Sequence, residues 1–113
     1  MDSVKDQIRV ADQVVAVIAG VAAQEIEEVA VGGSITFYDE WTKRLGAKNN
    51  AKGIMVEIGD MGASITLWVS VRYGTIISKT CQHLQEKVKE TVEFLTGLTV
   101  YEVNVRVEGL TIE

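Results

Sequence analysis

Residues 53–109 read GIMVEIGDMGASITLWVSVRYGTIISKTCQHLQEKVKETVEFLTGLTVYEVNVRVEG, and this stretch decides the fold. Apolar and polar residues alternate across 54–58 and again across 65–73, the period of strands with one buried and one wet face. Between them, Gly59-Asp60-Met61-Gly62 supplies small residues suited to a tight turn. We therefore expect two antiparallel strands joined by a hairpin.

The second half of this stretch predicts a helix followed by a third strand. Residues 101–107 alternate again, and a strand–helix–strand connection returns the third strand parallel to the second. Whether it lies beside the first strand or the second stays open at this stage. Gly97 is suited to end the helix. Between Ser78 and Thr96 the apolar positions follow the helical period, namely Cys81, Leu84, Val88, Val92 and Leu95.

The N-terminal part predicts another helix over residues 14–29, with Asp12 as its N-cap. Ile8 and Val10 are expected to form a short edge strand before it. Gly20 costs about 1 kcal/mol relative to alanine inside a helix, so a closely packed neighbour should compensate. That neighbour is either the second helix or a partner chain, and a membrane helix pair is an alternative. The flank concerned consists of Ala16, Ala19, Gly20 and Ala23.

Together these elements predict an α+β fold of two layers. Two main helices should pack on one face of a three-stranded sheet in the order α-β-β-α-β, with the short N-terminal strand as an addition. A chain of 113 residues buries a single core, so we expect one domain over residues 1–113. Residues 30–52 are expected to be an irregular loop with a short helix from Tyr38 to Leu45.

The composition argues against catalysis and against metal or cofactor binding. His83 is the single histidine and Cys81 the single cysteine, so neither a zinc site nor a Cys-His nucleophile is expected. A formal charge of −5 makes general nucleic-acid binding unlikely. The chain starts without a signal peptide pattern, and one unpaired cysteine favours the reducing cytoplasm. We expect a cytoplasmic protein without enzymatic activity and without a cofactor.

If both helices cover one sheet face, the opposite face stays open for a protein partner. Trp68 lies on it, and tryptophan is enriched among the residues that anchor protein interfaces. We expect this face to bind protein partners, with self-association into a homo-oligomer. The candidate residues are Met55, Trp68, Arg72, Asn104 and Arg106.

A second candidate site lies in the irregular loop. Four basic residues occur there without an intervening acid, although the chain as a whole is acidic. A solvated loop explains such a cluster, but an anion or partner site is an alternative. On that alternative the domain binds nucleic acid or anionic lipid. The residues concerned are Trp41, Lys43, Arg44, Lys48 and Lys52.

Five segments in this order resemble the alkaline shock protein family, also called the envelope stress response family, of Gram-positive and related bacteria. The chain departs from the family pattern where Phe37, Tyr38 and Trp41 replace a glycine-rich region and where Ser78 replaces a common proline. The resemblance implies a non-enzymatic cytoplasmic protein of cell-envelope homeostasis, peripheral to the inner face of the membrane through an integral membrane partner. It implies no catalytic or ligand site. The segments are residues 15–25, 45–53, 71–74, 88–98 and 102–107.

Overall fold

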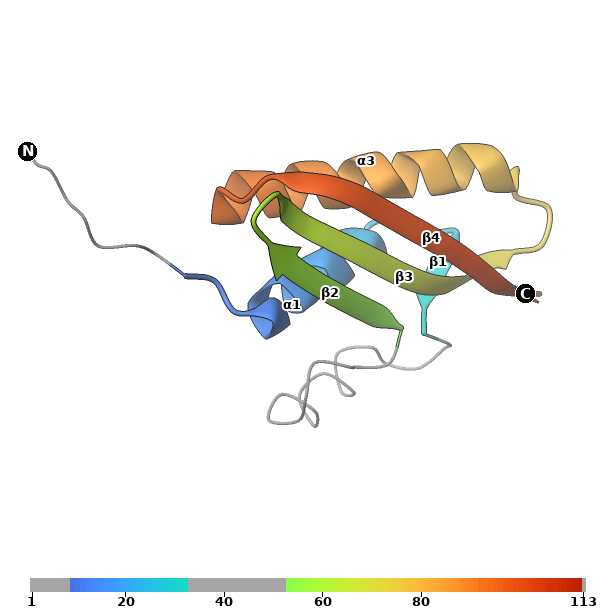
Figure 1. Cartoon of the computed structure of the whole chain (residues 1–113). Coiled ribbons are helices and arrows are strands. Elements are labelled where there is room, and N and C mark those ends of the chain that lie inside the picture. The colour runs from blue at the N-terminus through green and yellow to red at the C-terminus, as the bar shows by residue number, and fades with distance from the viewer. Residues whose placement is uncertain (1–8, 33–52, 113) are drawn as a thin grey trace, which may run out of the picture.

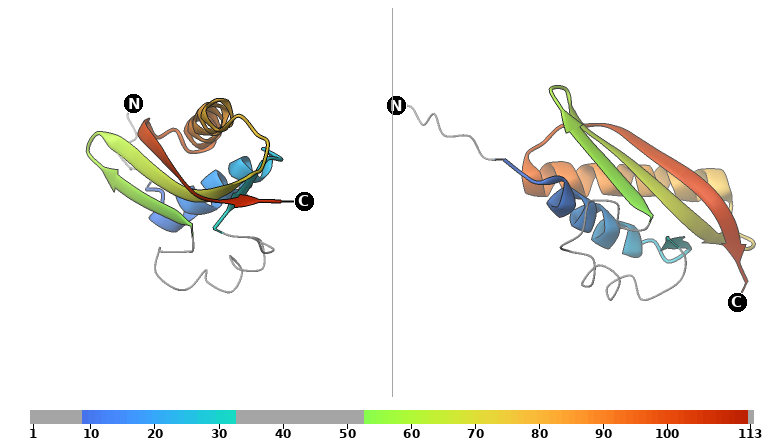
Figure 2. Two further views of the ribbon diagram at one scale, coloured as in Figure 1. Left: turned by 90° about the vertical axis from the view of Figure 1, so that its right-hand side faces the viewer. Right: turned by 60° about the horizontal axis from the view of Figure 1, so that its bottom comes forward.

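The computed structural model describes residues 9–32 and 53–112 (Figure 1). A sheet forms one layer and two helices lie together behind it, as Figures 1 and 2 show. The predicted two-layer α+β fold is confirmed. Its elements are α1 (Asp12–Gln24), β1 (Val29–Val31), β2 (Ile54–Gly59), β3 (Gly62–Arg72), α3 (Ile77–Thr96) and β4 (Val100–Thr111).

β3 is the central strand, and every other strand of the described chain pairs with it. The predicted hairpin joins β2 to β3, with Gly59 opposite Gly62. β4 pairs in parallel with β3 from Ala63 to Arg72, which confirms the predicted direction and settles the neighbour that the sequence left open. Because β4 occupies that whole edge, β1 shares the other edge with β2 and pairs antiparallel with residues 69–71.

The structure corrects the prediction for the end of the first helix. α1 ends at Gln24, and Val29, predicted as its last residue, begins the strand β1. β1 is therefore the strand that the three-stranded prediction lacked. The predicted edge strand before α1 is wrong at Val10, which lies in no strand. Ile8 lies outside the described residues. β-branched Val29 and Val31 pair along the part of β3 that β2 leaves free.

α1 packs against α3 as well as against β2 and β1, and α3 is one of the neighbours that the sequence allowed for its small flank. Ala16, Ala19 and Gly20 of this flank are all buried. Lys87 of α3 also forms an ion pair with Glu25, with 2.8 Å between Nζ and Oε1. The helix begins with Ala11 as its N-cap and Asp12 as its first residue, so the N-cap lies one position earlier than predicted.

α3 buries one side on the sheet through Leu84, Val88 and Val92, none of which is measurably exposed. Gly97 ends it with a φ of 80°, as predicted. Leu95 is 60% exposed, so the prediction that it joins the core is wrong. Leu98, which follows the turn at Gly97, packs against the core instead.

Candidate interaction surface

The face of the sheet that points away from both helices is called the outer face here. Alternation along β3 buries Ile65, Leu67 and Val69 beneath the helices and turns Thr66 and Trp68 the other way. No helix or strand of the described chain covers that side (Figure 1). The outer face consists of Met55, Glu57, Ser64, Thr66, Trp68, Ser70, Arg72, Glu102, Asn104 and Arg106.

Four of the five predicted partner-binding residues form one cluster on this face. Met55 and Asn104 lie on either side of Thr66, and Arg106 lies beside Trp68 in the next row. Trp68 is partly buried and does not belong to the core. Met55 is 40% exposed. An aromatic ring, a thioether and a guanidinium thus lie close together on the outer face.

Arg72 shares the outer face but lies apart from the cluster. It is six residues beyond Thr66 on the same strand, a separation of about 20 Å. Its guanidinium lies 4.0 Å from a carboxylate oxygen of Glu28, and both side chains are partly exposed, so this surface ion pair contributes little to stability. Of the predicted set, Arg72 is the member that the structure does not bring together with Met55, Trp68, Asn104 and Arg106.

The predicted anion or partner loop falls outside the described residues. This applies to Trp41, Lys43, Arg44, Lys48 and Lys52 alike.

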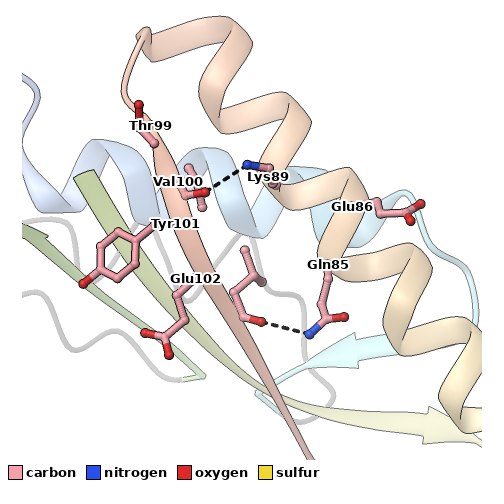
Figure 3. A pocket seen from close by; sticks show the side chains of 8 residues that line it. Gln85, Glu86, Lys89, Thr99, Val100, Tyr101 and Glu102 are labelled. Atoms are coloured by element: carbon pink, nitrogen blue, oxygen red, sulfur yellow. Dashed lines mark hydrogen bonds between the residues drawn. The ribbon is translucent and has the colours of Figure 1, made fainter. Parts of the chain in front are cut away.

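A hollow of about 360 Å³ between α3 and β4 was not foreseen from the sequence (Figure 3). Gln85 Nε2 donates to the Val103 carbonyl at 2.9 Å, and Lys89 Nζ donates to the Val100 carbonyl at 3.1 Å. The Val100 N–H donates to Glu93 Oε2 at 2.8 Å. These three side chains of α3 thus form hydrogen bonds with backbone groups on the free edge of β4. Unpaired backbone groups at a sheet edge can pair with a strand of another chain, and these hydrogen bonds block that pairing at Val100 and Val103. The signal was present in the sequence: positions 85, 89 and 93 form a polar row one step from the buried positions 84, 88 and 92.

The reactive side chains of the described chain do not assemble into a catalytic or metal-binding group. His83 is exposed and Cys81 is partly buried on α3. Burial raises the pKa of the Cys81 thiol, which disfavours the nucleophilic thiolate. Among the residues that the structure describes, no three His, Cys, Asp or Glu side chains lie close enough together to hold a metal ion.

Fold and surface together define a small two-layer α+β domain, with one sheet face that no helix or strand among residues 9–32 and 53–112 covers. The chain matches the alkaline shock protein 23 family over residues 1–112 and belongs to it; the family is described by its cell envelope-related function. The resemblance to the alkaline shock proteins is confirmed by this match.

Three relatives extend the match over most of their own length. The chain is 32% identical to the uncharacterized protein YqhY of Bacillus subtilis over 92% of this chain and 76% of that protein. It is 33% identical to the uncharacterized protein Spy1614 of Streptococcus pyogenes over 93% of this chain and 88% of that protein. It is also 33% identical to the uncharacterized protein YloU of Bacillus subtilis over 94% of this chain and 89% of that protein.

No solved structure matches the chain. Neither α1 nor α3 has both the length and the apolar composition needed to cross a membrane.

Proposed function

We propose that this protein is a non-enzymatic interaction module of the cell envelope, and that its outer face binds a protein partner. The observation that carries the proposal is the position of Trp68. The apolar ring of a tryptophan on a sheet face is removed from water only when a partner covers it. Trp68 lies beside Arg106 and diagonally across from Met55. Tryptophan and arginine are the residue types most enriched where binding energy concentrates at interfaces.

The cell envelope-related function of the family supports a place at the membrane. In this proposal the protein works at the cytoplasmic side and is held there by an integral membrane partner. The outer face supplies a protein contact of the module, because its exposed residues come from three strands of a sheet whose other side is packed against both helices. Such a surface needs little reordering on binding, so less of the interaction free energy is lost.

Replacing Trp68 by alanine tests the proposal. The affinity-tagged protein and its Trp68→Ala variant are used to capture partners from native membranes and from cytosol, followed by mass spectrometry. Proteins enriched with the wild type should be lost with the variant, because truncating such an anchor typically weakens binding by about 2 kcal/mol or more. The melting temperature should stay nearly unchanged, since Trp68 lies outside the core.

Phe94→Ala is the matched control. Phe94 is also an exposed aromatic, 86% accessible, but it lies on α3 in the helix layer. This variant should capture the same proteins as the wild type. If Trp68→Ala unfolds the protein, or if both variants behave like the wild type in capture, the outer face is not the binding surface.

A further inference from the structure

The charges of the outer face are separated along the strands. Glu57 and Glu102 lie on either side of Ser64, near the hairpin end of the sheet. Arg106 lies four residues further along β4 than Glu102, about 13 Å away, beside Trp68. The row between these two ends holds the uncharged residues Met55, Thr66 and Asn104. Two carboxylates and one guanidinium therefore lie on opposite sides of a row without charge, and Glu108 follows two residues beyond Arg106 on β4.

Glu102 and Arg106, two of the three charged residues of β4, remain able to bind a further partner. Glu102 Oε1 accepts a hydrogen bond from Ser64 Oγ at 2.8 Å, which fixes the carboxylate and leaves its second oxygen able to accept another N–H. Arg106 is exposed and forms no ion pair with any other residue in the part of the chain that the structure describes. Its planar guanidinium is suited to a carboxylate held in a fixed position.

We infer that the partner that fits the outer face is a second copy of this chain, packed face to face and related by a two-fold axis. Stacked sheets keep their strand directions within about 30° of each other, so two arrangements need to be compared. If the axis runs along the strands, Glu57 of one copy faces Glu102 of the other, and like charges meet. If the axis crosses the strands at the row of Met55, Thr66 and Asn104, Glu102 faces Arg106 of the second copy, twice. Charge complementarity selects the second arrangement.

The same arrangement gives the large side chains room. Rotation about the two-fold axis at the central row places Trp68 of each copy over Ser64 of the other, where a small side chain can accommodate an indole ring. Met55 of one copy meets Met55 of the other, and a methionine adapts its shape to such a contact. The centre of the contact is thus apolar or neutral, and the two Glu102–Arg106 pairs lie toward its rim. This inference rests on the proposed function, because it names the partner of the same surface.

Charge reversal tests the pairing in the full-length protein. Sedimentation at increasing concentration should show a reversible dimer for the wild type. Arg106→Glu makes two acidic groups face each other, and Glu102→Arg does the same with two basic groups, so each variant should dimerise about tenfold more weakly or worse. An equimolar mixture of the two variants should restore association. The Arg106→Glu variant carries a glutamate at both positions and the Glu102→Arg variant an arginine at both, so each of the two contacts in the mixed dimer pairs a carboxylate with a guanidinium.

Two further variants locate the contact. Lys79→Glu changes the net charge as Arg106→Glu does but lies exposed on α3, so it should leave the dimer unchanged. Met55→Glu should disrupt the dimer, because it places two carboxylates against each other on the axis. If the charge variants act but Met55→Glu does not, the copies join through the edges of β4 and the face-to-face inference is wrong.

A wild type that stays monomeric at all soluble concentrations also overturns the inference, as does a dimer that neither charge reversal weakens. Failure of this inference and failure of the proposed function give different results. A monomeric protein whose captured partners still depend on Trp68 keeps its interaction surface and loses only the second copy as the partner. A dimer that charge reversal weakens, together with capture that does not depend on Trp68, supports the second copy as partner and contradicts the binding of other proteins through Trp68.

Discussion

Replacing Gly62 by alanine should destabilise the domain strongly, because Gly62 lies where the hairpin meets the start of β4. Its φ of 125° is a conformation that side chains other than glycine rarely adopt, at a cost of about 1–3 kcal/mol. A Cβ atom there would lie only 2.3 Å from the carbonyl oxygen of Thr99. That oxygen accepts the N–H of Ala63 at 2.7 Å, so moving it also weakens a hydrogen bond worth about 1 kcal/mol. Together these terms amount to about 2–4 kcal/mol.

The assay is thermal unfolding followed by circular dichroism. For a domain of this size, about 2–4 kcal/mol corresponds to a melting temperature lower by about 8–16 °C. Gly59→Ala is the matched control, because it changes the other end of the same turn. A Cβ atom at Gly59 meets nothing within 4 Å, and its φ is not positive. If both variants melt within about 2 °C of each other, the close contact between Gly62 and Thr99 does not exist as described.

Two further predictions concern α3. Leu84→Ala should lower the free energy of unfolding by about 2–5 kcal/mol because Leu84 is fully buried, whereas Leu95→Ala should cost less than about 0.5 kcal/mol because Leu95 is 60% exposed. Urea unfolding measures both, and equal losses would contradict the assignment of the buried side. The N–H of Val100 and the ammonium of Lys89 bind Glu93 and lower the pKa of its carboxyl group. This stabilisation is therefore present above the ordinary carboxyl pKa and is lost as the pH falls through the lower native value. The difference in melting temperature between the wild type and Glu93→Gln should shrink between about pH 7 and about pH 3, and a constant difference would refute this role.

Much of the fold could be predicted because its patterns are local. The alternation along residues 65–73 correctly assigned which side chains of β3 are buried, since a strand turns successive residues to opposite faces. The same alternation placed Met55, Trp68, Asn104 and Arg106 together on the outer face. The hairpin at residues 59–62 and the end of α3 at Gly97 depend on glycine conformations that short sequence patterns reveal.

Other features depended on contacts between distant parts of the chain. Val29 continues the apolar period of α1, yet it forms a strand because Val71 of β3 lies opposite it. Leu95 continues the apolar period of α3, yet its side chain is exposed. The chain turns at Gly97, and Leu98 packs against the core instead. The capping of β4 by Gln85 and Lys89 was overlooked because a polar row on a helix is usually a solvated surface.

The sequence by itself determined the period of each element and therefore which side chains must be buried, because the geometry of a strand or helix relates each residue to its near neighbours alone. Only the tertiary structure decided that β4 lies beside β3, and therefore that Glu102 lies beside Ser64 and Arg106 beside Trp68. Either neighbour would have buried the same apolar side chains, so burial could not select between them. That choice required the packing of the whole sheet, including the close contact that glycine at position 62 permits with Thr99.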